Sequence, residues 1–108
     1  MPKAIMVAQS RPSHPDREDD YNEWHTNTHI PDVLAIDGIN AARRYKVSTA
    51  TPVGADAYPY VAVYDLEADD LGAIVAELGA RAMDGRMKMD DAMEMDPVPS
   101  MVIYELID

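Results

Sequence analysis

The 108-residue chain contains no cysteine and no phenylalanine, and it has few basic residues. The lack of cysteine excludes disulfides, thiolate metal sites and cysteine nucleophiles. Nine basic residues against 20 acidic residues give a formal net charge of −11, which repels nucleic-acid phosphates and anionic membrane surfaces. No apolar run approaches the length of a membrane span, and the amino terminus lacks a signal-peptide pattern. We therefore expect a cytoplasmic protein that binds neither nucleic acid nor membrane.

Because phenylalanine is absent, all the aromatic side chains, six tyrosines and one tryptophan, carry a polar group. Such groups need hydrogen-bond partners when they are buried, which favours a partly polar cavity over a wholly apolar core. The composition is otherwise ordinary, with 47% hydrophobic and 27% charged residues. The length predicts a single domain over residues 1–108.

Proton-transferring side chains are concentrated between Tyr21 and Pro31, a stretch that contains the only tryptophan and two of the three histidines. In a helix, the spacing would bring five residues of this stretch, and Asp32 just after it, to one face. They are Tyr21, Trp24, His25, Thr28, His29 and Asp32. Histidine can take up or release a proton near neutral pH, so this face has the chemistry of an acid–base site.

Hydrophobic patterning and turn residues predict four strands and two main helices. In chain order they are strand Lys3–Gln9, helix Pro15–Thr28, strand Ile39–Ser48, strand Tyr60–Leu66, a helix from Asp69 to Gly85, and strand Met101–Ile107. Pro31 lacks an amide hydrogen, so we expect the first helix to break near His29, with a short turn over 31–35. Thr51–Ala57 is predicted to be a loop.

Residues 86–99 alternate methionine with acidic residues and end in two prolines. This pattern predicts a loop with a short helical turn. Because methionine adapts to irregular surfaces, we interpret the segment as an apolar lid over a cavity or a dimer edge.

The β-α-β-β-α-β order predicts an α+β, ferredoxin-like fold, with a four-stranded antiparallel sheet and two helices on one face. The opposite face would leave a large apolar area in water. A second copy of the chain would cover it, so we expect a homodimer in the form of a closed α+β barrel.

Three short runs resemble the EthD-like family of dimeric α+β-barrel proteins. They are Tyr21-Asn22-Glu23-Trp24-His25, His29-Ile30-Pro31-Asp32 and Ala42-Arg43-Arg44-Tyr45. The resemblance implies a ligand cavity between the first helix and the sheet, often without a cofactor. It also implies that His29, the histidine of the His-x-Pro element, lies near that cavity.

His29 and His25 are the predicted acid–base residues, although a histidine at a helix break can instead cap free carbonyl groups. Arg43 and Arg44 are neighbours on a strand and therefore point to opposite faces. One of them could reach into the cavity and hold a substrate oxyanion, and we name Arg43 for this role, although both arginines could instead form ion pairs on the acidic surface. Aromatic residues are the predicted substrate-binding groups, although buried tyrosines often only fill space: Tyr21, Trp24, Tyr45, Tyr60, Tyr64 and Tyr104.

These residues favour a cofactor-free isomerase, cyclase or lyase that acts on a small, largely apolar, oxygenated molecule. A cofactor-independent monooxygenase and a non-catalytic ligand-binding dimer are the alternatives, and haem binding is a weaker one. The spacing of His25 and His29 suits a helical metal site. The zincin motif His-Glu-x-x-His requires a glutamate directly after the first histidine, and Thr26 occupies that position, so no metal is expected. The methionines suit Cu(I), but no histidine or cysteine is close to them in sequence.

Overall fold

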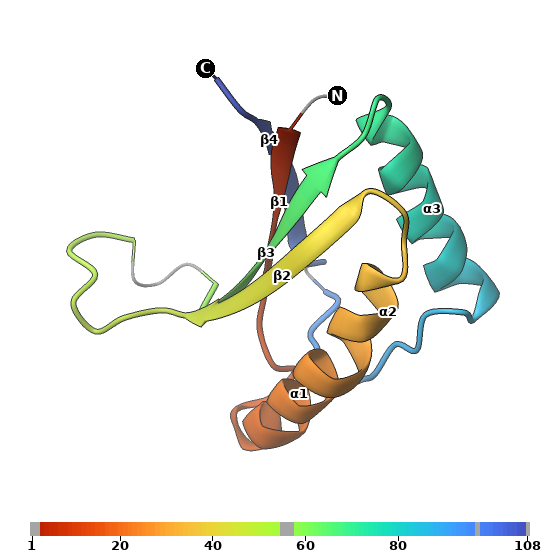
Figure 1. Cartoon of the computed structure of the whole chain (residues 1–108). Helices are drawn as coiled ribbons and strands as arrows, with labels where there is room; N and C mark the ends of the chain where they lie inside the picture. Colours follow the sequence, from red (N-terminus) through yellow and green to blue (C-terminus); the bar gives the residue numbers. More distant parts are fainter. Residues whose placement is uncertain (1–2, 55–57, 97, 108) are drawn as a thin grey trace.

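A four-stranded antiparallel sheet carries the helices on one of its faces, as Figure 1 shows for the computed structural model. The structure describes residues 3–54, 58–96 and 98–107. The elements are β1 (Lys3–Ser10), the 3₁₀ turn η1 (Pro15–Arg17), α1 (Glu18–Trp24), the π-helical turn η2 (His25–His29), α2 (Ile30–Leu34), β2 (Ile39–Lys46), β3 (Tyr60–Glu67), α3 (Leu71–Asp84) and β4 (Ser100–Glu105). The strand order is β2-β3-β1-β4. The predicted α+β, ferredoxin-like fold is confirmed.

Alternation along β3 shows how the sheet separates its two faces. Tyr60, Ala62, Tyr64 and Leu66 are buried beneath the helices, while the residues between them point the other way. The main core cluster joins these side chains to β1, α2 and α3 and consists of Ala4, Met6, Val33, Ile36, Ile39, Ala62, Tyr64, Leu66, Ile74, Leu78 and Met87. A smaller cluster lies under α1 and consists of Tyr21, Trp24, Tyr60, Ala92 and Met93.

The predicted interruption near His29 is present as a π-turn between two α-helical segments, α1 and α2, and not as a break in the helical path. The chain stays helical through a π-turn, in which the amide of Ile30 donates to the carbonyl of His25, five residues earlier. The wider turn resets the hydrogen-bond register just before Pro31. Pro31 then lies in the first turn of α2, where a missing amide donor costs little.

The remaining boundaries differ from the predictions by small amounts. Strand β2 ends at Lys46 rather than Ser48, and β4 ends at Glu105 rather than Ile107. Helix α3 is capped as its ends predict: the Asp70 carboxylate accepts from the Ala73 amide, and Gly85 has φ of 86°. Segment 86–96 contains a hydrogen-bonded turn between Asp90 and Met93 in place of the predicted helical turn. Residues 55–57 of the predicted loop, and Pro97, lie outside the described residues.

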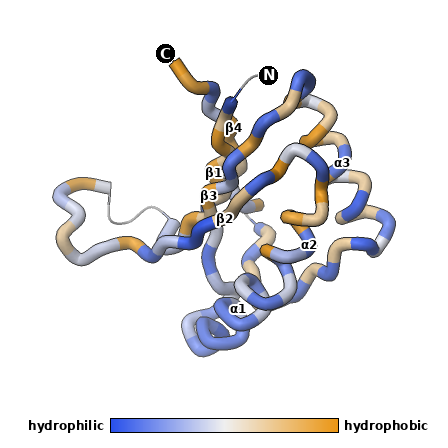
Figure 2. Tube along the Cα trace, viewed as in Figure 1, coloured by the Kyte–Doolittle hydropathy of each residue, from blue (hydrophilic) through white to orange (hydrophobic). Residues whose placement is uncertain are grey.

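The sheet face away from the helices, the open face, is largely apolar. Figure 2 shows hydrophobic residues along β1, β3 and β4, in contrast to the hydrophilic α1. Four large side chains on this face are more than a third exposed: Ile5, Tyr45, Val102 and Tyr104. Within the described residues, no helix is long and apolar enough to cross a membrane.

Candidate functional site

A cavity of about 340 Å³ lies between the helices and the sheet, and both His25 and His29 line it. Its other walls are mostly apolar and include six of the eight methionines of the chain. These are Met6, Met87, Met89, Met93, Met95 and Met101. The methionine-rich segment therefore forms part of the wall of this cavity.

A larger groove of about 650 Å³ lies elsewhere, beside the ends of β1, β3 and β4. It includes Lys3, Tyr104 and Ile107 but neither histidine. Because chemistry needs reactive side chains rather than volume, we place the candidate site in the smaller cavity.

The π-turn η2 presents the two histidines side by side. Their ring centroids are 5.0 Å apart and the ring planes are nearly perpendicular, at 83°. The Trp24 ring stacks on His29 at 4.9 Å, and the Tyr21 ring meets His25 edge-on at 5.5 Å. These contacts fix both imidazoles, because packed aromatic neighbours leave each ring few alternative rotamers.

Both imidazoles are neutral at neutral pH. Burial, together with the positive charges of Arg44 and of a protonated His29, lowers the pKa of His25 to about 3. Burial also lowers the pKa of His29 to about 4, with Asp32 opposing the shift and Arg44 adding to it. Within the described residues, the Nδ1 atoms of both rings are buried without a hydrogen-bond partner. A neutral imidazole retains one nitrogen able to accept a proton.

Two hydroxyl groups complete the polar part of the cavity. Burial raises the pKa of Tyr64, so its hydroxyl stays protonated and can donate to a ligand oxygen. Ser10 also lines the cavity and shares a short hydrogen bond with the Tyr21 hydroxyl. Burial raises the pKa of Tyr21 as well.

The structure places Arg44, not Arg43, on the helix side of the sheet. The Arg43 guanidinium points to the open face, where it forms a bidentate pair with Asp65 at 2.9 and 3.2 Å. The Arg44 guanidinium instead donates to Thr26 Oγ1 and Asn22 Oδ1, both at 2.9 Å. The alternation of β2 separates the two arginines as predicted, but the sequence assigned the wrong one to the side of the histidines.

Of the six predicted substrate-binding residues, only Tyr64 lines the cavity. Tyr45 and Tyr104 are exposed on the open face, at 51% and 55%. Tyr60 is directed elsewhere: its hydroxyl donates to Glu18 and accepts from Asn22. Tyr21 and Trp24 pack behind the histidines. Met6 and Ser10 also line the cavity although neither was predicted to, and their inward positions follow from the alternation along β1.

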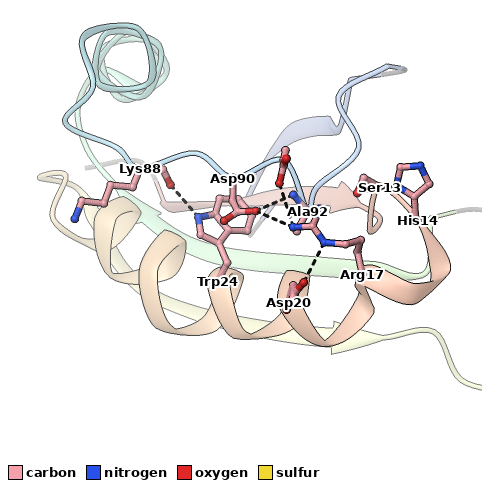
Figure 3. Close-up of polar contacts among 9 residues, drawn as sticks. Ser13, His14, Arg17, Asp20, Trp24, Lys88, Asp90 and Ala92 are labelled. Carbon is pink, nitrogen blue, oxygen red and sulfur yellow. Dashed lines mark hydrogen bonds and ion pairs between the residues drawn. The ribbon is translucent and has the colours of Figure 1, made fainter.

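Polar contacts tie the methionine-rich segment to the first helix (Figure 3). The Trp24 indole donates to the Lys88 carbonyl at 2.9 Å, and Arg17 pairs with Asp90 and Asp91. The Asp32 carboxylate accepts from the Lys88 amide at 3.0 Å. Most of these contacts are exposed ion pairs or single hydrogen bonds, so each contributes little by itself. The buried side chains of Met87, Ala92 and Met93 anchor the same segment in the two core clusters.

The fold brings the methionines and the histidines together, which removes one objection to a Cu(I) site. A second objection remains: the burial and the Arg44 charge that disfavour a proton on each imidazole also disfavour a metal cation there. In the described part of the chain, no three residues among histidine, aspartate and glutamate are grouped so as to hold a metal ion.

No protein-family model and no curated protein matches the chain. Among solved structures, an ethyl tert-butyl ether D (EthD) family protein from Bacillus halodurans is similar over 99% of this chain and 100% of its own, with 16% identity and a TM-score of 0.62. An EthD-like protein from Ralstonia eutropha is similar over 100% and 96%, with 15% identity and a TM-score of 0.58. A dimeric ferredoxin-like protein of unknown function from Thermobifida fusca is similar over 97% and 92%, with 16% identity and a TM-score of 0.54. At the level of fold, these likenesses confirm the resemblance to EthD-like proteins.

The lowered histidine pKa values predict that acidification destabilises the protein. In the unfolded chain both histidines have a pKa of about 6.5, so as the pH falls they take up protons at a higher pH than in the folded protein. Their contribution to the free energy of unfolding is therefore fully present above pH 6.5 and is lost as the pH falls towards 4 for His29 and 3 for His25. Each histidine should lower the free energy of unfolding by up to about 1.4 kcal/mol per pH unit in this window. Urea unfolding between pH 7 and pH 5 measures the slope.

The matched controls are His25→Asn with His29→Asn, which removes both titrating groups, and His14→Asn, which removes the exposed histidine. The double variant should show a shallower dependence on pH, and H14N should follow the wild type. An unchanged slope in the double variant would show that the buried histidines do not cause the effect.

Proposed function

We propose that this protein is a cofactor-free acid–base enzyme, an isomerase, cyclase or lyase, acting on a small, largely apolar, oxygenated molecule. The observation that carries the proposal is the pair of neutral histidines at the wall of a largely apolar cavity of about 340 Å³. A cavity of this size can enclose a ligand with one or two rings. Its methionine walls suit a flat ring, because thioethers make favourable contacts with aromatic edges.

In the proposed reaction, His29 or His25 removes a proton from carbon or oxygen and returns it at another position. The imidazolium formed in a buried site is a strong acid, as the lowered pKa values indicate, so it gives the proton back readily. The Tyr64 hydroxyl, kept protonated by burial, would donate to the oxyanion that develops on the substrate. Tyr64 thus takes the role predicted for Arg43, the stabilisation of a substrate oxyanion.

Two alternative functions would use the same cavity. In a cofactor-independent monooxygenase, the same base would generate a carbanion that reacts with oxygen. A ligand-binding protein without catalysis is favoured by one specific observation: imidazoles with pKa values of about 3 and 4 are weak bases. For a binding protein, the histidines would supply hydrogen-bond acceptors for a ligand hydroxyl group.

We further propose that a second copy of the chain covers the open face of the sheet. The exposed side chains of Ile5, Tyr45, Val102 and Tyr104 support this interface, because apolar surfaces of this kind rarely face water. The similar protein from Thermobifida fusca, and another from Jannaschia, are described as dimeric.

Proton exchange on an apolar bicyclic ketone, 2-tetralone, tests the enzymatic proposal. In D₂O, the wild type should accelerate the loss of the α-proton signals in the ¹H NMR spectrum, because a cavity base removes a carbon-bound proton. H29N, H25N or both should lose about 10²-fold of that acceleration, the usual contribution of a positioned base. Tyr64→Phe should also slow the exchange, whereas H14N should not.

The alternatives give different results. Saturable binding of 2-tetralone with exchange no faster than in buffer would favour the ligand-binding protein. Oxygen consumption with an oxidised product would favour the monooxygenase. Equal acceleration by the wild type and the double histidine variant would reject the histidines as the base.

Light-scattering mass measurement tests the proposed dimer. The wild type should have twice the 12.0 kDa mass of one chain. Val102→Asp places a charge on the open face and should give monomers, because an unpaired charge is costly in an apolar interface. Met83→Asp, at an 89% exposed position on α3, is the control and should remain dimeric. A monomeric wild type would contradict the proposal.

A further inference from the structure

We propose that Arg44 is a positioning residue, which holds the π-turn η2 against the sheet and sets the electrostatic environment of both cavity histidines. It is not a residue of the cavity wall, so it acts through His25 and His29 rather than on a ligand. The inference rests on the proposed function for its purpose, because a base must be neutral to accept a proton. Its test needs no substrate.

The contacts of Arg44 bridge the two layers of the fold. From β2, the guanidinium donates to Asn22 on α1 and to Thr26, the second residue of the π-turn. Its Cζ atom also lies 5.4 Å from the ring centroids of both Tyr21 and Tyr60. A planar guanidinium can make two hydrogen bonds and contact two aromatic rings at once, which a lysine ammonium cannot reproduce. Arg44 is thus a fixed charge beside the histidine-bearing turn.

The Asn22 side chain completes the arrangement. Its oxygen accepts from Arg44 at 2.9 Å, and its nitrogen donates to the Tyr60 hydroxyl at 3.2 Å. This amide holds the guanidinium without neutralising it. Acidic residues are frequent in this protein, yet position 22 holds a neutral asparagine, where an aspartate or glutamate would neutralise the charge of Arg44.

Few charges act on the two histidines from the elements packed around them. From β2, Arg44 disfavours protonation of both rings, while from α2 Asp32 favours protonation of His29. The groups from α1, β1 and β3 are Tyr21, Ser10 and Tyr64, which are uncharged, and segment 86–96 contributes methionine side chains. The Asp32 carboxylate is itself held by the Lys88 amide. Burial is the largest cause of the lowered histidine pKa values, and apart from a protonated His29, which acts on His25, Arg44 is the cation that contributes to them.

Titration of the histidine C2–H signals by ¹H NMR tests the inference, with His14 as the internal control. Arg44→Gln should raise the pKa of His25 and of His29 by about one unit. This is the effect expected when a nearby, partly solvent-exposed positive charge is removed. Arg43→Gln makes the same chemical change on the opposite face of the sheet and should leave both pKa values as they are. Assignment follows from the single histidine variants.

A second variant separates charge from packing, because R44Q also removes a space-filling side chain. Asn22→Asp keeps the arginine and its hydrogen bond but places a carboxylate against the guanidinium, so it should raise both pKa values too. Unchanged values in N22D and R44Q, or an equal rise in R43Q, would overturn the inference. If R44Q fails to fold, N22D and R43Q decide the outcome by the same measurement.

The two proposals can fail separately. Raised histidine pKa values without any exchange of 2-tetralone would support the role of Arg44 and reject the enzymatic function. Normal exchange in R44Q with unchanged histidine pKa values would support the function and reject the role of Arg44.

Discussion

Pro31 cannot donate a helical hydrogen bond, and the chain responds by widening the turn that precedes it. In an unbroken α-helix its ring would clash with an earlier carbonyl group. The π-turn from His25 to His29 avoids the conflict and keeps the helix continuous into α2. It also places both histidines on the cavity wall, with their rings 5.0 Å apart. A backbone constraint thereby positions the side chains on which the proposed chemistry depends.

The surroundings of that turn determine what the histidines can do. Aromatic rings from α1 restrain them, methionines enclose the space in front of them, and Arg44 lies on the side of the sheet. Burial and positive charge act in the same direction and keep the imidazoles neutral. The cavity is consequently suited to an uncharged ligand, and its proton acceptors are available across the physiological pH range.

Most of the fold was predictable from local patterns, whereas the site was predictable only in part. Strand β3 follows from its alternation and α3 from its apolar stripe, because burial on one face dictates both. The π-turn was not predictable, since proline is usually interpreted as a helix breaker and the alternative depends on tertiary packing. The choice between Arg43 and Arg44 depends on the strand register, because a shift of one residue exchanges the two faces. The apolar character of the methionine-rich segment follows from its composition, but its place beside the histidines at one cavity depends on tertiary structure, because about 60 residues of sequence separate them.

The central claim is that His25 and His29 are both neutral while they share one apolar cavity. Long-range ¹H–¹⁵N correlation spectra of the imidazole rings at pH 6 measure this directly, because a neutral ring has one protonated and one unprotonated nitrogen. The structure predicts the neutral pattern for both residues at this pH, below the ordinary histidine pKa of 6.5. Two protonated nitrogens in either ring would contradict the account.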